Sequence, residues 1–183
     1  TEETSEGPEK VKDEKEEWLL LSRNNCFLSL YKDLLEAKGI LYKDKEGLSI
    51  KQKDIDLIDL YDRLSKGEKI EPHLLTGLLK VLKVKNYLAP WSSVFDWSKS
   101  KISYILNFLE RGKPLETNIT VSTIHKAKGG EADNVAVLRD CTYQVHKNIK
   151  KNPDTEHRVF YVGFTRAKKK LFIVSPTGKY FYQ

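Results

Sequence analysis

Short apolar runs separated by helix-length segments constrain the fold of this chain most strongly. They occupy Trp18–Ser22, Ile119–Thr123, Val135–Leu138 and Leu171–Val174. The first run is almost entirely apolar, which is typical of a strand buried on both faces. A helical pattern around residues 155–164 separates the last two runs. Strands that alternate with helices predict an α/β fold with a mostly parallel sheet flanked by helices.

The first apolar run opens a strand–helix–strand unit. Asn24 or Asn25 is suited to cap the helix that follows, because a short amide side chain can accept a bond from a free backbone N–H. Apolar residues from Phe27 to Leu35 recur at helical spacing, and a glycine, Gly39, supplies the stop. Ile40–Tyr42 is then expected to form the second strand of the unit. At the other end of the chain, Tyr180–Tyr182 is expected to add an edge strand.

Residues 44–115 follow a different pattern, because apolar positions repeat every three or four residues between polar ones. Helices are predicted over about residues 51–65, 72–83 and 97–111. This middle third is interpreted as a small helical insertion within a domain that spans residues 18–183.

Three aromatic residues, Trp91, Phe95 and Trp97, lie close together in that insertion. They can pack between helices, or their rings can stack on nucleic-acid bases. The sequence leaves both interpretations open.

Charge is distributed unevenly along the chain, whose net charge is +6. Residues 123–170 hold eleven Lys or Arg against five Asp or Glu, whereas residues 1–17 hold three against eight. The acidic segment offers almost nothing to bury and has the composition of a linker or disordered tail. A local basic surface suits a polyanion such as nucleic acid, although a solvated lysine-rich face has the same composition.

Several classes of protein are disfavoured by what the sequence lacks. It has no apolar run of about 18 residues and no signal-peptide pattern, so we expect an intracellular protein that does not span a membrane. Cys26 and Cys141 form no C-x-x-C pair and are expected to be reduced core residues without a metal. Because the chain begins with Thr1 and contains no methionine, we expect a fragment or a processed chain.

Two short blocks place basic and hydroxyl side chains next to strands. In the first block, Thr123–Asp133, Gly129 and Gly130 allow the backbone to approach a ligand, unless they merely make a turn. Glu131 can accept hydrogen bonds from a sugar hydroxyl, while Lys128 and Thr123 can meet phosphate oxygens. The sequence holds no G-x-x-x-x-G-K-[ST] loop. A nucleotide site would therefore be shared with protein outside this chain.

The second block, Arg158–Ala167, is predicted to be helical and ends at Arg166. A guanidinium at the end of a packed helix can contact phosphate oxygens during transfer, or it can pair with a carboxylate. Arg23 and Thr123 each follow a predicted strand, so we expect both at the carboxyl end of the sheet, where ligands gather in open α/β folds.

Both blocks resemble motifs of one family. The stretch 123–135 (TIHKAKGGEADNV) resembles motif V of the UvrD/Rep-type superfamily 1 DNA helicases, and 156–167 (EHRVFYVGFTRA) resembles their motif VI. The stretch 18–24 (WLLLSRN) is similar to the looser motif IV, although Ser22 stands where the family often has an aromatic residue. The resemblance covers little of residues 44–115, which are far shorter than the 2B domain of the best-known members.

The resemblance implies a RecA-like C-terminal motor domain, usually called 2A, of an ATP-dependent DNA helicase or translocase. An absent N-terminal RecA-like domain would carry the Walker motifs and bind most of the ATP and Mg²⁺. Single-stranded or duplex DNA would be the other partner, in replication or repair, in the nucleoid-associated cytoplasm of a prokaryotic or viral setting.

The resemblance also implies roles for single residues. Arg166 would be the arginine finger, Arg23 a second γ-phosphate contact and Glu131 the ribose ligand, so these three should meet at one end of the sheet. Gly129, Thr123 and Lys128 would complete this side of the ATP cleft, and Thr123, His125 and Lys128 would also contact DNA. Two alternatives stay open: a nucleic-acid-binding module that has lost the motor, and a domain whose middle third recruits a partner protein.

Overall fold

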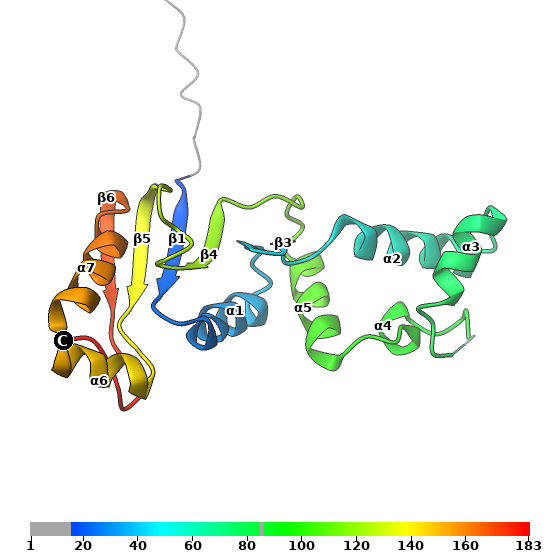
Figure 1. Ribbon diagram of the computed structural model, residues 1–183. Coiled ribbons are helices and arrows are strands. Elements are labelled where there is room, and N and C mark those ends of the chain that lie inside the picture. The colour runs from blue at the N-terminus through cyan, green and yellow to red at the C-terminus, as the bar shows by residue number, and fades with distance from the viewer. Residues whose placement is uncertain (1–15, 85) are drawn as a thin grey trace, which may run out of the picture.

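The computed structural model describes residues 16–84 and 86–183, and it shows a sheet with flanking helices from which a helical arm projects (Figure 1). The sheet has six strands in the order β3-β2-β4-β1-β5-β6. The strands are β1 (Trp18–Ser22), β2 (Lys43–Asp44), β3 (Gly47–Leu48), β4 (Ile119–Thr123), β5 (Ala132–Leu138) and β6 (Ala167–Val174). The helices are α1 (Leu28–Ala37), α2 (Gln52–Ser65), α3 (Pro72–Leu79), α4 (Trp91–Val94), α5 (Lys99–Glu110), α6 (Tyr143–Lys151) and α7 (Pro153–Phe164), with a 3₁₀ turn at Asn25–Phe27.

Strand direction is nearly uniform across the sheet. β1 lies between β4 and β5 and is parallel to both, β6 is parallel to β5, and β2 is parallel to β4. Among the described strands, only the short β2–β3 hairpin is antiparallel. The expected α/β fold with a mostly parallel sheet is therefore confirmed.

Alternate residues of the central strands fill a separate core on each face of the sheet. On one face, Leu20 and Ala136 pack with Tyr31 and Leu35 of α1. On the other face, Leu21, Val137 and Val135 pack with Phe160 of α7. Burial on both faces explains why β1 reads as a continuous apolar run.

Some predicted elements differ from the structure. Ile40–Tyr42 is not a strand, because the chain pairs with β4 only from Lys43 onward. Tyr180–Tyr182 contributes a single bridge, from Phe181 to Asp140, instead of an edge strand. Helix α6 was not predicted, because its apolar positions are outnumbered by lysine, glutamine and asparagine. The predicted cap also differs, since the Asn24 side chain accepts a bond from the Thr142 backbone at 3.2 Å and none from the first helical turn.

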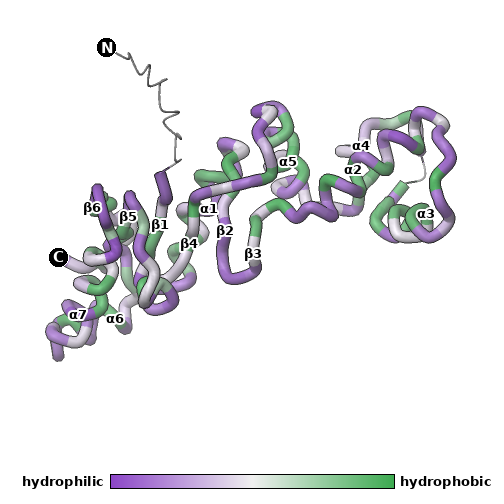
Figure 2. The backbone as a smooth tube through the Cα atoms, turned by 90° about the horizontal axis from the view of Figure 1, so that it is seen from above, coloured by the Kyte–Doolittle hydropathy of each residue, from purple (hydrophilic) through white to green (hydrophobic). Residues whose placement is uncertain are grey.

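The arm contains helices α2 to α5 and has its own small core. The aromatic rings of Trp91, Phe95 and Trp97 pack against one another, with Phe95 and Trp97 centroids 4.5 Å apart. Phe95 is completely buried. This arrangement favours the packing role of these residues over base stacking. Figure 2 shows from a second direction that the arm extends away from the sheet.

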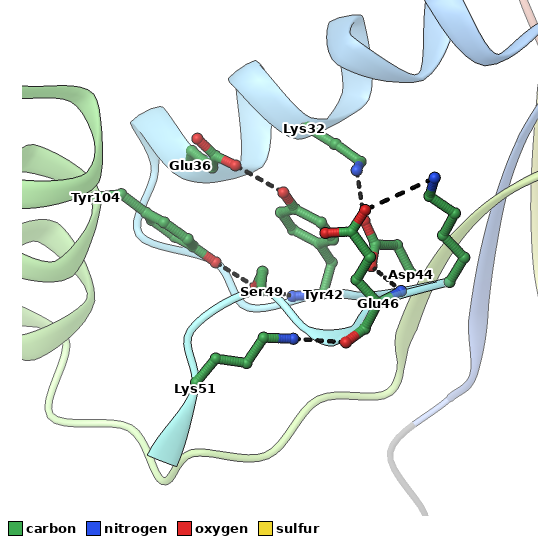
Figure 3. A network of polar contacts seen from close by, with 9 residues as sticks. Lys32, Glu36, Tyr42, Asp44, Glu46, Ser49, Lys51 and Tyr104 are labelled. Atoms are coloured by element: carbon green, nitrogen blue, oxygen red, sulfur yellow. Dashed lines mark hydrogen bonds and ion pairs between the residues drawn. The ribbon is translucent and has the colours of Figure 1, made fainter. Parts of the chain in front are cut away.

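The arm is fastened to the sheet where α5 meets the end of α1. Gly39 has a φ of 61°, and a side chain there would collide with the backbone of Asn107 in α5. The hydroxyl of Tyr104 donates to the carbonyl of Ile40 at 3.0 Å and lies 2.6 Å from Ser49 Oγ. Figure 3 shows these contacts continuing through Tyr42 to α1. The junction is therefore a defined polar network and not a free linker.

None of the helices that the structure describes is long and apolar enough to cross a bilayer. The linker predicted over residues 1–17 lies outside the described residues, apart from Glu16 and Glu17.

Candidate functional sites at two ends of the sheet

The first sequence block runs from one end of the sheet to the other. Thr123 ends β4 at the carboxyl end of the sheet, which lies next to α6 at the bottom of the sheet in Figure 1. The carbonyl of Thr123 accepts bonds from the N–H groups of Lys126 and Ala127, at 3.0 and 3.1 Å, which closes one helical turn. Ile124 and Ala127 are buried in the core beneath α7. The chain then reaches Ala132, where β5 begins at the amino end.

Glu131 and Arg166 lie together at the amino end of the sheet. The N–H of Ala132 donates to the carbonyl of Arg166 at 3.0 Å, which places the end of α7 beside the start of β5. Arg166 Nε donates to the carbonyl of Val162 at 2.9 Å, and Nη1 lies 3.5 Å from the carbonyl of Gly130. The guanidinium is thus half-buried and held next to the exposed Glu131.

Glu131 lines a cleft of about 350 Å³ that extends from this end along β4 as far as Ser122 and Lys126. The other lining groups are mostly polar and include Lys43, Asn118 and Thr120. Gly129 has a φ of 86°, a backbone conformation that favours glycine, and no atom lies close to the position of a Cβ there. The glycine pair therefore makes a turn, and it also leaves space for a ligand to approach the backbone.

Arg23 lies at the carboxyl end of the sheet and is bound to α7. Its Nε and Nη2 donate to the two carboxylate oxygens of Glu156, at 2.7 and 3.0 Å. The Glu156 side chain is 3% exposed and that of Arg23 is 18% exposed. Sequence reasoning missed Glu156, because it lies among polar residues at the start of α7, beside Asp154, and nothing in the local sequence marks it as buried.

The predicted meeting of Arg23, Glu131 and Arg166 is wrong. Arg23 and Thr123 do lie together, since the N–H of Ile124 donates to the carbonyl of Ser22 at 3.0 Å. Glu131 and Arg166 lie at the opposite end. The reason is that α7 runs antiparallel to the strands and carries Arg166 a whole helix length away from Glu156. The 124–131 segment likewise crosses the sheet instead of forming a local connection.

A polar groove of about 340 Å³ opens at the carboxyl end between α1, the β2–β3 hairpin and β4. It is lined by hydroxyl, amide and ammonium groups that include Asn25, Ser29, Thr123 and Lys126. Two further lysines line it, of which Lys32 binds Asp44 and Lys45 lies near Glu46. Lys126 has no ion-pair partner among the residues that the structure describes. His125 and Lys128 are exposed on the segment that leaves the groove.

The two sequence blocks are also packed against each other. A Cβ on Gly163 of α7 would lie 3.2 Å from side-chain atoms of Ile124, which is tighter than ordinary contact. The glycine thus allows α7 to lie close to the 124–131 segment. The two blocks are therefore in direct van der Waals contact.

The fold and the two ends together define an α/β domain of the RecA-like kind, with a polar groove at one end and a clustered carboxylate and arginine at the other. The chain belongs to the UvrD-like helicase C-terminal domain family, whose family model matches residues 9–177. It is thus the C-terminal domain of a helicase-type protein. No individual protein of curated function matches the sequence.

Proposed function

We propose that this chain is the C-terminal motor domain of an ATP-dependent DNA helicase or translocase. It would complete an ATP site whose larger part lies on an N-terminal RecA-like domain. The observation that supports the proposal is the position of Arg166 at the amino end of the sheet, where its Nη1 lies 3.5 Å from the carbonyl of Gly130, the residue before Glu131. Family membership supports the same assignment.

Arg166 fits the role of a transition-state clamp. Its Nε donates to the α7 carbonyl of Val162 at 2.9 Å, and its Nη2 donates to Thr165 Oγ1 at 3.2 Å, so the guanidinium is already oriented. The 3.5 Å contact of Nη1 with the Gly130 carbonyl is long enough to be exchanged for a phosphate oxygen. A guanidinium held in this way loses little freedom when it contacts phosphate oxygens.

Glu131 fits the role of a ribose ligand. It is exposed, it lines the cleft at the amino end, and it follows the open turn at Gly129 and Gly130. A carboxylate accepts hydrogen bonds from sugar hydroxyls. The chain offers no complete phosphate cradle, so the partner domain would bind the triphosphate and Mg²⁺.

The groove at the carboxyl end fits a DNA backbone. Thr123, Lys126 and Asn25 present a hydroxyl, an ammonium and an amide to it, and these groups bind phosphate oxygens well. His125 and Lys128 would extend this contact along the exposed segment. Arg23 has a different role in this proposal, because Glu156 engages two of its nitrogens at the far end from Arg166.

The test is the Arg166→Ala variant of the full-length protein. We expect ATP turnover to fall by about 10³-fold or more while most of the ATP affinity remains. Arg158→Ala is a matched control, because Arg158 is an exposed arginine on the same helix. Unchanged turnover in Arg166→Ala would remove Arg166 from the role of transition-state clamp, whereas a full-length protein without any ATP turnover would leave a nucleic-acid-binding module.

The purified chain alone provides a second test. Because the phosphate cradle is absent from its sequence, it should not hydrolyse ATP. Measurable hydrolysis that survives further purification would contradict the shared site.

A further inference from the structure

We propose that helix α6 forms a second contact for single-stranded nucleic acid, with Lys147, Lys150 and Lys151 on the phosphates and the Tyr143 ring stacked on a base. This inference rests on the proposed polynucleotide-binding function and extends the bound strand beyond the groove already described. The sequence blocks that carry the family resemblance do not include this helix.

The charge on α6 itself is of one sign, and the first acid that follows it in the sequence is the exposed Asp154 in the first turn of α7. Residues 141–153 hold three lysines and no Asp or Glu, and residues 175–183, which pack beside them, hold Lys179 and no acid. The lysines Lys147, Lys150 and Lys151 are exposed, and none of them forms an ion pair within the described part of the chain. Such a cluster attracts a polyanion and gains affinity by releasing its counterions.

The neighbouring carboxylate is turned away from this surface. Asp140 is fully buried, and it accepts bonds from the backbone N–H groups of Thr177 and Gly178 at 3.0 and 2.6 Å. These bonds hold the C-terminal segment against α6. The acid therefore stabilises the surface without cancelling its charge.

An aromatic ring lies within the basic cluster. Tyr143 is 59% exposed at the first turn of α6, and its ring centroid lies 5.3 Å from that of Tyr180. The centroid of the Tyr180 ring also lies 5.4 Å from that of His146. Tyr143 thus packs against Tyr180 and is still more than half exposed to solvent. An exposed, supported aromatic among lysines suits base stacking, which is independent of sequence.

Two buried nitrogens near this surface, Arg139 Nε and His146 Nδ1, have no hydrogen-bond partner within residues 16–84 and 86–183. The Arg139 guanidinium lies 5.8 Å from the Phe181 ring. Buried polar groups are usually paired, so these two nitrogens fit a bound water beneath the surface.

The surface is continuous with the groove at the carboxyl end. The backbone N–H of Thr142, which begins α6, donates to Asn24 Oδ1 at 3.2 Å. Asn24 adjoins Asn25, which lines the groove. A strand that leaves the groove therefore passes over β1 and β5 and arrives at Tyr143. Duplex DNA would bind less well, because its bases are already stacked on one another and cannot stack on the Tyr143 ring.

The experiment measures fluorescence anisotropy of labelled oligothymidylate with the purified chain at several salt concentrations. For the triple variant Lys147→Gln, Lys150→Gln, Lys151→Gln, we expect about tenfold weaker binding and a salt slope smaller by about 2, since each lost phosphate contact removes about 0.7. Tyr143→Leu should weaken single-strand binding by about fivefold or more with an unchanged slope, and should not affect a duplex.

The control triple Lys80→Gln, Lys83→Gln, Lys99→Gln removes the same charge from exposed positions on the arm and should leave the affinity unchanged. If Lys45→Gln with Lys126→Gln in the groove weakens binding but the α6 variants do not, the inference is wrong and the proposed function stands. If the unaltered chain does not bind at all, the polynucleotide-binding function itself fails. Equal competition by polyglutamate would show a site for any polyanion, such as an acidic protein segment, and would also overturn the inference.

Discussion

The ion pair between Arg23 and Glu156 makes a quantitative prediction about stability. Glu156 is 2% exposed. Within the described residues, its carboxylate forms an ion pair only with Arg23, at 2.7 Å. Arg23→Ala leaves a buried carboxylate without its counter-charge. Removing one partner of a buried pair costs about 3–5 kcal/mol of the free energy of unfolding. At about 2–4 °C per kcal/mol for a domain of this size, the melting temperature should fall by roughly 6–20 °C.

Substitution of the other partner, Glu156, should lower the free energy of unfolding by less. Glu156→Gln keeps the shape and one acceptor oxygen, and Arg23, at 18% exposed, can recover water contacts. We expect the free energy of unfolding of this variant to fall by about 1–3 kcal/mol, which is the cost of leaving a buried polar group imperfectly paired. The double variant Arg23→Met with Glu156→Leu replaces both charges with apolar groups and should be more stable than Arg23→Ala.

The assay is urea denaturation of the purified chain followed by circular dichroism, with Arg158→Ala as the exposed control on the same helix. The control should stay within about 0.5 kcal/mol of the unaltered chain. The reasoning is refuted if Arg23→Ala also stays within that range, or if the double variant is no more stable than Arg23→Ala. Either result would mean that Arg23 does not fasten α7 to the carboxyl end of the sheet.

Two other features give further predictions. Gly67→Ala, at positive φ with open space around it, should lower the free energy of unfolding by about 1–2 kcal/mol in a thermal melt. Gly39→Ala carries the same cost and also meets the backbone of Asn107, which adds about 1–3 kcal/mol, so about 2–5 kcal/mol is expected. Equal costs would show that the contact between α1 and α5 yields easily. Burial raises the pKa of the Cys141 thiol to about 11, so this thiol stays protonated at pH 8, and iodoacetamide should label the exposed Cys26 quickly and Cys141 only after unfolding. Rapid labelling of both cysteines in the folded chain would contradict the buried position of Cys141.

The strands were predictable because burial leaves a direct trace in the sequence. β1 and β4 have the predicted bounds, and the bounds of α2 and α5 differ from the prediction by at most two residues. β5 and β6 begin earlier than their apolar runs, since their first residues are polar or lysine-rich yet still pair with neighbouring strands.

The geometry of the sites was less predictable, because distance along the chain does not reveal which end of a sheet a residue reaches. The block 123–133 reads as one local loop, but the structure stretches it across the sheet with Ile124 and Ala127 buried on the way. The partnership of Arg23 with Glu156 joins residues 133 positions apart, so local sequence carries little information about it. Placement of the two ends therefore required the three-dimensional fold.

The central claim is that opposite ends of one sheet bind different ligands, with nucleotide at Glu131 and Arg166 and DNA at the groove. The most direct measurement is the ATPase rate of the full-length protein, titrated separately with ATP and with oligothymidylate, for Glu131→Gln and for Lys45→Gln. We predict that Glu131→Gln raises the KM for ATP alone and that Lys45→Gln raises the half-saturating concentration of oligothymidylate alone. If both variants shift the same parameter, the two ends do not serve separate ligands and the account is wrong.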